Sequence, residues 1–493
     1  MSTTAAGRCP RLKLLSNDQI GGIITEAKQI LAKVGVKIHS REGLERLGDA
    51  GAVIAYADQR AYFPTDLLEN ALQTVPAAVS LYDRSGSTEI RLEGDNVFFT
   101  PTSSNIKVWD QNQQKLRNPL CRDLVDFTRI TDALDHIAIQ SANYYPVDIA
   151  TEAASCFRHF ICLRHSPKPI FGSIIPTAAN FDILMAMLTA VRGSEQALRE
   201  KPLLCSAVPT LSPLQWLPDN YDLVTRFARA GIPNVIAMAP AMGVSAPVTI
   251  IGSVTQLIAE FLSGVVISQS VRPGAPVLAG SYIEFFEMRL GTTCMGSMVN
   301  FMADMAAVEV VRRLNIPSLV FMGCSDAKRP DAQAGLESGM GMLLGALCGA
   351  NIVQGAGGLS DVIPGSLAKL VIDNEICGMV YRLLQGVSGD AAASTQDLYS
   401  QGLNKGDHFL LSSDTLQYFR PEGGYAGTVL DRQSVETWRE KGAESAEQRA
   451  GKQVKHILAT HEPEPLDEDV NKALVDIMQG YARKFGMAEL PVK

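Results

Sequence analysis

A short stretch in the second half of the chain gathers side chains that could do chemistry. In FMGCSDAKRPDAQAG, residues 321–335, an apolar run ends, and a thiol, a hydroxyl, two carboxylates and two cations follow within eight residues. Asp326 stands directly at the end of the apolar run, so we predict that its carboxylate takes part in catalysis. Asp331, next to Pro330, is instead predicted to cap the helix that starts near residue 332.

Seven other apolar runs also end in polar or aromatic residues. We predict that the side chains at these ends, together with those of the 321–335 stretch, bind the substrate: Asn105, Tyr144, Tyr282, Glu284, Phe285, Phe321, Lys328, Asn351 and Gln354. Aromatic residues with a few carboxylates suit a cation, above all a quaternary ammonium, because its methyl groups donate no hydrogen bond and rest against aromatic faces. A substrate carboxylate would need a donor, and the candidates are Lys328, Arg329, Asn105, Asn351 and Gln354.

The residue types that are missing from these ends also carry information. None of the seven histidines follows an apolar run, which argues against a Ser-His-Asp triad and against hydrolysis by a histidine base. Two cysteines and two histidines recur every third residue in CFRHFICLRH, residues 156–165. Three residues turn a helix by about 300°, so these four side chains spread over half of its circumference. No metal site is therefore predicted.

Several of the candidate residues also have a plainer structural explanation. Aromatic residues such as Tyr144 close the mouths of barrels about as often as they bind ligands. Glu284 and Glu287 are three residues apart and could pair with Arg289 at the surface. Met238 is predicted to fill the core, and so is Met242.

The elements that must position these residues follow a repeated pattern from residue 96 onward. Short apolar runs alternate with helical stretches, which is typical of parallel strands buried on both faces. The runs are NVFFTPTSSN, HIAIQSANYYP, KPIFGSIIP, PLLCSAVPTLSP, PNVIAMAPAMG, PVLAGSYIEFFE, PSLVFMGCSD and ANIVQGAGGLSD. Eight such units predict an α/β fold, a closed (β/α)8 TIM barrel, in which chemistry takes place at the carboxyl ends of the strands.

An open doubly wound sheet is the competing architecture. It would bring a glycine-rich phosphate turn after its first strand, and FFTPTSSN contains none. Gly341, Gly345 and Gly349 lie four residues apart inside a predicted helix, where they indicate a close-packing face rather than a dinucleotide loop.

Three regions are predicted along the chain. Residues 1–95 form an N-terminal α+β extension, residues 96–389 the catalytic barrel, and residues 390–493 a mostly helical C-terminal extension. Near the end of the chain, HEPEPLDEDVNKALVDIMQ predicts a proline-rich segment leading into a helix capped by Asp467.

Composition limits the partners and the compartment. The chain has 493 residues, 46 % hydrophobic and 19 % charged, and a net charge of −8, which argues against a nucleic-acid partner. The apolar stretch 248–271 is interrupted by Gln256, Glu260 and Gln269, so a buried helix is predicted rather than a membrane span. No signal peptide is apparent, and the nine cysteines lack a disulfide spacing, so we expect a cytoplasmic protein. Its large apolar helices are compatible with a homo-oligomer.

Several stretches resemble one known family. GCSDAKRPDAQAGLES (323–338), GALCGANIV (345–353) and LVIDNEICGMVYRLLQG (370–386) are similar to the trimethylamine methyltransferase superfamily. DHFLLSSDTLQYFR, LDRQSVETW and HEPEPL resemble that family's C-terminal region.

The resemblance implies a (β/α)8 barrel that moves a methyl group from an amine to the Co(I) corrinoid of a cognate corrinoid protein. It implies no permanently bound cofactor, because the partner carries the corrinoid. Trimethylamine-specific members carry pyrrolysine, and this sequence contains none, so it resembles the branch that demethylates glycine betaine, proline betaine or carnitine. That branch often has a histidine after the eighth strand, where Gln354 stands here.

Three hypotheses follow for the function. The first is a corrinoid-protein-dependent methyltransferase that acts on a small quaternary amine, a betaine above all. The second is a non-catalytic barrel that binds a betaine or a corrinoid protein. The third is an unrelated barrel lyase or hydrolase that uses Asp326 and Glu284 as acid and base, against which the absence of a histidine or metal set at the strand ends speaks.

Overall fold

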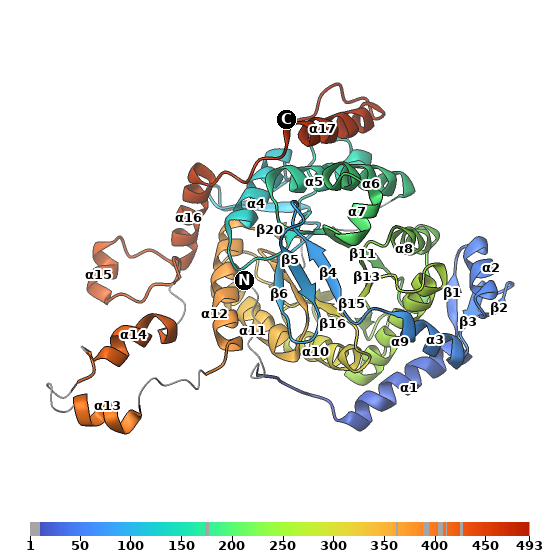
Figure 1. Ribbon diagram of the computed structural model, residues 1–493, viewed down its shortest axis with the longest axis horizontal. Helices are drawn as coiled ribbons and strands as arrows, with labels where there is room; N and C mark the ends of the chain where they lie inside the picture. Colours follow the sequence, from blue (N-terminus) through green and yellow to red (C-terminus); the bar gives the residue numbers. More distant parts are fainter. Residues whose placement is uncertain are drawn as a thin grey trace.

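Eight parallel strands form a ring at the centre of the computed structural model (Figure 1). The structure describes residues 10–172, 177–360, 363–387, 394–402, 408–410, 412–423 and 427–492. In chain order the strands are β6 (Phe98–Pro101), β9 (Gln140–Ser141), β10 (Ile170–Gly172), β11 (Leu204–Pro209), β13 (Asn234–Met238), β15 (Val277–Ser281), β18 (Ser318–Val320) and β19 (Ile352–Ala356). From β9 onward each strand pairs with the next, β19 pairs with β6, and Ala138 N donates to Phe99 O at 3.1 Å where β6 and β9 meet. The predicted barrel is confirmed, although residues 173–176 of the third run lie outside the described residues.

Helices surround the strands and follow them in turn. They are α4 (Cys121–Ala133), α5 (Thr151–His165), α6 (Ala178–Arg192), α7 (Glu195–Glu200), α8 (Pro218–Ala230), α9 (Ile250–Val271), α10 (Met298–Arg313), α11 (Ala332–Cys348) and α12 (Leu367–Leu384). Within the described part of the chain, α9 alone is long and apolar enough to cross a membrane, and 83 % of its most apolar window is buried inside the protein. The prediction of a buried helix over 248–271 is confirmed.

The glycines of α11 show why this helix lies so close to the barrel. A Cβ on Gly341 would lie 1.8 Å from Met322 O, and one on Gly345 would lie 3.1 Å from the Val353 side chain. The predicted close-packing face is therefore confirmed at these two positions. Gly349 has a different role from the predicted one, because it ends α11 in the left-handed conformation, with φ +91°.

The barrel is closed at its amino-terminal end. The side chains of Val79 and Leu81 in β4 (Val79–Tyr82) and of Ile90 and Leu92 in β5 (Glu89–Leu92) share one hydrophobic cluster with inward-facing residues of the eight-stranded sheet. This hairpin crosses the centre of the ring in Figure 1, and Tyr82 N donates to Pro202 O, just before β11. The carboxyl ends of the strands therefore form the mouth.

The N-terminal region is joined to the barrel by a shared sheet. Its elements are α1 (Asn17–Lys33), β1 (Val36–Ile38), α2 (Arg41–Asp49), β2 (Val53–Ala55), β3 (Arg60–Tyr62) and α3 (Thr65–Thr74). Strand β1 pairs in parallel with β12 (Gln215–Trp216), which follows β11, and α1 packs on α9. The boundary at residue 95 stays a prediction, as does the boundary at residue 389.

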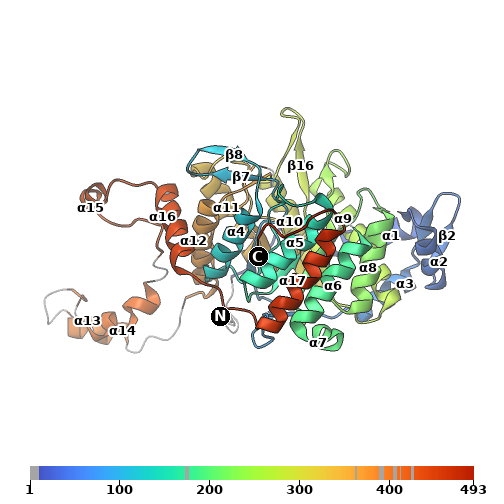
Figure 2. The same ribbon diagram turned by 90° about the horizontal axis from the view of Figure 1, so that it is seen from above.

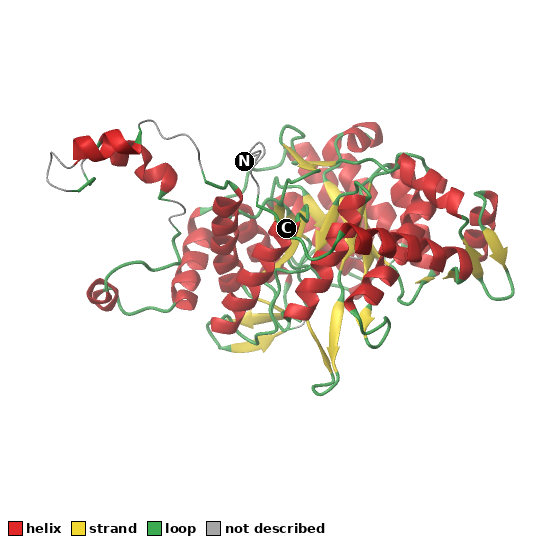
Figure 3. Ribbon diagram, turned by 90° about the horizontal axis from the view of Figure 1, so that it is seen from below, coloured by secondary structure: helices red, strands yellow, loops and turns green. Residues whose placement is uncertain are grey.

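Short sheets project from the mouth, all on the same end of the barrel (Figures 2 and 3). One joins β7 (Lys107–Asp110), β8 (Lys115–Arg117) and β20 (Pro364–Gly365). The other joins β14 (Ala241–Met242), β16 (Glu284–Glu287) and β17 (Thr292–Cys294). Both follow barrel strands directly, so they form the rim of the mouth.

The C-terminal region is helical, as predicted. It contains α13 (Thr395–Gly402), α14 (Ser413–Glu422), α15 (Val435–Glu440), α16 (Ala446–Thr460) and α17 (Glu468–Arg483). Helix α16 packs on α12 and α4, and α17 packs on α5 and α6. Asp467 accepts the N–H groups of Asp469 and Val470, which confirms the predicted cap of α17.

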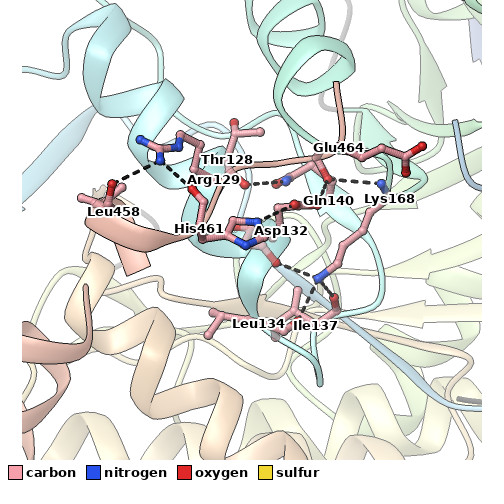
Figure 4. Close-up of polar contacts among 12 residues, drawn as sticks. Thr128, Arg129, Asp132, Leu134, Ile137, Gln140, Lys168, Leu458, His461 and Glu464 are labelled. Atoms are coloured by element: carbon pink, nitrogen blue, oxygen red, sulfur yellow. Dashed lines mark hydrogen bonds and ion pairs between the residues drawn. The ribbon is translucent and has the colours of Figure 1, made fainter. Parts of the chain in front are cut away.

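The HEPEPL stretch is tied down beside the end of α4 (Figure 4). His461 Nε2 lies 2.7 Å from Asp132 Oδ2, and Arg129 Nη2 donates to the carbonyls of Leu458 and His461. Nearby, Lys168 Nζ donates to the carbonyls of Thr131, Leu134 and Ile137 at 2.7, 2.8 and 2.7 Å, and burial lowers the pKa of this lysine to about 8. These contacts lie before β9 and β10 begin, so they anchor the tail at the end opposite the mouth.

Candidate active site

Three of the predicted substrate-binding residues meet inside the mouth. Tyr282 stacks on Phe321, with ring centroids 5.7 Å apart and an interplanar angle of 26°. The Tyr282 hydroxyl donates to Gln354 Oε1 at 2.8 Å, and Gln354 Nε2 donates to Ser103 Oγ at 3.2 Å. Burial raises the pKa of Tyr282, so this hydroxyl stays protonated at neutral pH. The aromatic pair thus carries no charge of its own.

Small residues lie beside this pair, deeper in the barrel. Ala207 and Ala237 face inward from β11 and β13 and are 6 % and 8 % exposed, whereas Cys205 and Val235 one layer below are fully buried. Solvent therefore reaches the alanine layer and no further. A Cβ on Gly280 would lie 3.2 Å from the Tyr282 ring and 2.6 Å from the Val235 side chain, so the glycine leaves the tyrosine its place.

The Asp326 carboxylate accepts hydrogen bonds from the backbone of a neighbouring loop. Its Oδ1 accepts the N–H of Met295 at 3.0 Å, and its Oδ2 accepts that of Gly296 at 2.9 Å. Burial raises the pKa of Asp326, and the two N–H donors oppose that shift. The carboxylate therefore fixes the connection into α10, and its predicted catalytic part stays a prediction. Asp331 accepts the N–H groups that begin α11, which confirms its predicted role as a cap.

Glu337 supports the same stretch from α11, and sequence reasoning missed it. Its Oε2 accepts the Ser325 hydroxyl at 2.6 Å and the Asp326 N–H at 2.8 Å. Lys328 lies further out, exposed, and its Nζ donates to Asp326 O at 2.7 Å. The polar residues after β18 are thus largely engaged in holding their own loop.

The predicted position of Asn351 at the mouth is wrong. This residue precedes β19 rather than following it, and therefore lies at the amino-terminal end of the barrel. There its Oδ1 accepts the N–H of Ser318 at 3.1 Å and its Nδ2 donates to Asn96 O at 3.0 Å. Asn351 joins three strand beginnings.

Tyr144 also departs from its predicted orientation. Its ring is fully buried and packs edge-on against Phe127 of α4, with centroids 5.4 Å apart. Its ring therefore packs on the helix layer, while its hydroxyl approaches Gly365 of β20, where an added Cβ would lie 2.7 Å from it. Asn105 lies near it, buried, with its N–H donating to Asn143 Oδ1 at 3.3 Å and its carbonyl accepting from Tyr145 N at 3.0 Å.

Glu284 and Phe285 stand on the rim, in strand β16. Phe285 N donates to Asn300 Oδ1 at 2.6 Å, and Asn300 Nδ2 donates to Ile283 O at 3.0 Å, so one asparagine of α10 fixes the root of the hairpin. At its other end Glu287 pairs with Arg289 at 2.8 Å, which confirms one of the two alternatives for this acid. Met238 and Met242 are buried in the core, as predicted.

The end of β19 and the turn that follows it approach the β18 exit closely. Gly355 has a φ of +128°, and a Cβ there would lie 2.5 Å from Cys324 N, so only glycine fits. Asp373 of α12 accepts the Gly357 N–H at 2.7 Å and pairs with Lys369 at 2.6 Å. This buried ion pair supports the turn that follows β19; its i,i+4 spacing is visible in the sequence, but its burial is not.

A (β/α)8 barrel that is sealed at one end and presents an aromatic pair at its mouth belongs to the class of barrels that act on small molecules. The family model described as trimethylamine methyltransferase (MTTB) matches residues 2–486. The chain therefore belongs to the trimethylamine methyltransferase family, as the resemblance in its motifs predicts.

Two sequence relatives match nearly the whole chain. Trimethylamine methyltransferase MttB of Desulfitobacterium hafniense (strain DSM 10664 / DCB-2) is 30 % identical over 475 residues, 96 % of this chain and 95 % of that protein. A glycine betaine methyltransferase of D. hafniense (strain Y51) is 27 % identical over 479 residues, 97 % of this chain and 98 % of that protein. Among solved structures, the monomethylamine methyltransferase MtmB of Methanosarcina barkeri aligns with a TM-score of 0.46 and 12 % identity, over 95 % of this chain and 92 % of that one.

Proposed function

We propose that this protein moves a methyl group from a quaternary amine to the Co(I) corrinoid of a partner protein. The observation that carries the proposal is the stacked pair of Tyr282 and Phe321, held in the mouth by a neutral glutamine. Aromatic faces bind a quaternary ammonium with about 0.5–2 kcal/mol per contact, depending on how far the cation is desolvated. Family membership supplies the reaction class, and the pair supplies a place for the cation.

The chemistry needs little from the protein beyond positioning. The Co(I) centre of the partner supplies the electron pair for the new bond to carbon, and the C–N pair leaves with the amine. Because a quaternary nitrogen leaves as a neutral amine, no general acid has to protonate it. The protein holds the cation, directs one methyl group outward and limits the access of water. Tyr282 and Gln354 suit this task, since both are neutral and hydrogen-bonded to each other.

A betaine is the substrate that we favour within this class. The sequence contains no pyrrolysine, and one relative over nearly the whole chain is named a glycine betaine methyltransferase. Gln354 lies in β19, near the position where the betaine-demethylating branch often has a histidine, so the particular betaine is left to the assay. The eight cysteines of the described residues are free, which supports a reducing compartment such as the cytoplasm.

The partner must reach the mouth, and the rim offers an apolar surface there. Val244, Val248, Met288 and Leu290 are 64, 58, 67 and 71 % exposed. Met288 and Val248 are neighbours, because both side chains lie within 3.6 Å of a Cβ placed on Gly243. We propose that a corrinoid protein docks on this part of the rim.

The test mixes the enzyme, a reduced corrinoid protein and one amine, and follows the absorbance of cobalt. We expect conversion of Co(I) to methyl-Co(III) with a betaine and none with trimethylamine. Tyr282→Leu removes one ring and should lower kcat/KM by about tenfold or more. No spectral change with any quaternary amine and the cognate partner would contradict the proposal.

The same experiment separates the two other hypotheses. Calorimetric binding of a betaine without methyl transfer would favour a binding protein. Turnover that needs no corrinoid protein and shows a bell-shaped pH profile would favour a lyase or hydrolase. Tyr144→Phe is the matched control, since this tyrosine faces the helix layer.

A further inference from the structure

Buried polar atoms without a hydrogen-bond partner gather at the carboxyl ends of β6 and β9. Within the described ranges they include Thr102 Oγ1, Asn143 Nδ2, and Nε and Nη1 of Arg158. All three side chains are fully buried. Because buried polar groups in folded proteins are almost always paired, several unpaired ones in adjacent segments indicate a place that a ligand completes.

Arg158 dominates this cluster. It reaches from α5 toward the mouth, where Nη2 donates to Ser104 Oγ at 3.3 Å and to the Ala142 carbonyl. Its guanidinium lies 3.8 Å from the centroid of the Tyr145 ring. No Asp or Glu in the described part of the chain forms an ion pair with it, although a buried guanidinium stays charged and is usually paired.

The unpaired atoms specify the kind of ligand. Guanidinium and amide nitrogens can only donate, and a hydroxyl can donate as well as accept. A group that satisfies them must therefore accept hydrogen bonds, and a positive charge beside it favours an anion. A planar carboxylate matches the fork of a guanidinium with two parallel N–H···O bonds.

The cluster and the aromatic pair flank the same loop, residues 102–104. On one side, a Cβ on Gly358 would lie 3.1 Å from both Thr102 Cβ and Cys324 Sγ, and Cys324 packs with Tyr282 and Phe321. On the other side Arg158 contacts Ser104. The loop itself is held by Gln354, which bonds Ser103 and Tyr282. This shared loop is the basis on which we assign an ammonium on the aromatic pair and an anion on Arg158 to one molecule.

We propose that Arg158 is the residue that binds the substrate carboxylate, with Thr102 and Asn143 completing the anion site. The inference rests on the proposed function for the cation, and it makes Arg158 the residue that distinguishes a betaine from an amine without a carboxylate. Sequence reasoning named Lys328, Arg329, Asn105, Asn351 and Gln354 for this task. Lys328 and Arg329 are exposed, and Lys328 donates to its own loop. Asn351 lies at the amino-terminal end of the barrel, and Gln354 bonds Tyr282 and Ser103.

Three probes separate the two halves of the substrate in a calorimetric titration. Glycine betaine carries the ammonium and the carboxylate, tetramethylammonium carries only the cation, and 3,3-dimethylbutanoate carries only the carboxylate on a neutral isostere. For Arg158→Gln we expect the affinity for glycine betaine and for dimethylbutanoate to fall by about tenfold to a hundredfold, with tetramethylammonium unchanged. Arg158→Lys keeps the charge but lacks the two parallel N–H donors of a guanidinium. Its affinity for the two carboxylates should therefore lie between those of the wild type and Arg158→Gln.

Two further variants guard against a merely structural effect. Thr102→Val removes an unpaired hydroxyl at nearly constant shape, so it should leave the melting temperature unchanged and weaken the two carboxylates selectively. Arg164→Gln, on the same helix, loses a bond to Asn471 Oδ1 away from the mouth and should not alter the ranking of the probes.

The outcomes distinguish this inference from the proposed function. Methyl transfer from quaternary amines with equal affinity of wild type and Arg158→Gln for glycine betaine would overturn the role of Arg158 alone. Binding of dimethylbutanoate that depends on Arg158, with no methyl transfer from any amine, would overturn the proposed function alone. Equal losses for all three probes would mean that Arg158 only shapes the mouth.

Discussion

The ion pair of Lys369 and Asp373 offers the sharpest stability test in this barrel. Both side chains are 1 % exposed, and Nζ lies 2.6 Å from Oδ2. Lys369 also donates to Ser338 Oγ at 2.7 Å, and Asp373 accepts the Gly357 N–H at 2.7 Å. The perturbation is a double-mutant cycle with Lys369→Met, Asp373→Asn and both together.

Each single substitution leaves an unpaired charge buried in the core. Breaking a buried pair by removing one partner costs about 3–5 kcal/mol, because the remaining charge cannot be hydrated. The double variant has no charge left, and the amide oxygen that Asp373→Asn introduces can still accept the Gly357 N–H, so we expect a loss of only about 1–2 kcal/mol. The coupling energy of the cycle is then about 4–9 kcal/mol, far above the 0.5–3 kcal/mol usual for neighbouring residues.

Urea denaturation at neutral pH gives the free energies of unfolding. The matched control is the exposed pair of Arg41 and Glu45, also four residues apart, with side chains 81 % and 51 % exposed. The corresponding cycle there should show a coupling of about 0.3–0.5 kcal/mol. If the double variant at Lys369 and Asp373 loses as much as the two single variants summed, the reasoning about stranded charge is wrong.

Three other predictions concern single residues of the barrel and its loops. Burial raises the pKa of Asp304 to about 8, so the folded state keeps a proton that the unfolded chain loses above about pH 4. The free energy of unfolding should therefore fall by up to about 1.4 kcal/mol per pH unit between these two pH values. Urea titrations of Asp304→Asn should lack this slope. Asp326→Ala, which deprives two backbone N–H groups of their acceptor, should lower turnover more than tenfold at temperatures where circular dichroism shows it folded; unchanged turnover would refute this. Tyr144→Phe, which removes a hydroxyl unpaired within the described residues, should raise the free energy of unfolding by about 1 kcal/mol and leave activity unchanged; a large activity loss would restore its predicted place at the mouth.

Local rules account for what could be predicted from the sequence. The eight apolar runs became strands because parallel strands bury both faces and leave an unbroken apolar signal. The caps Asp331 and Asp467 follow from side-chain bonds to nearby N–H groups, which sequence distance alone specifies. The proximity of Tyr282 and Gln354 could be predicted because strand ends in a barrel meet at one face, and their part in binding a substrate stays a prediction.

The predictions that the structure overturns, and the residue that sequence reasoning missed, concern features that neighbouring residues in the sequence do not determine. Strand β9 spans only Gln140 and Ser141, too few residues to fix which face the following Tyr144 takes. Asn351 lies before β19 rather than after it. A run of apolar residues does not show at which residue its strand begins, so the position of Asn351 could not be read from the sequence. Arg158 lies on α5, whose residues 153–163 are all buried, so the helix has no polar stripe that would make one arginine conspicuous.

The charged groups around the mouth share a role that a reading of residue types alone does not indicate. Glu260 accepts the hydroxyls of Thr210 and Ser212 and the N–H of Leu214, and Asp326 accepts the N–H groups that lead into α10. Carboxylates bound in this way stiffen loops, and they leave aromatic and amide groups to face the ligand. Methyl transfer between a fixed cation and an incoming partner depends on positioning. In this barrel acidic residues therefore hold the loops of the mouth in place, and the role proposed for the positive charge of Arg158 is to select the substrate.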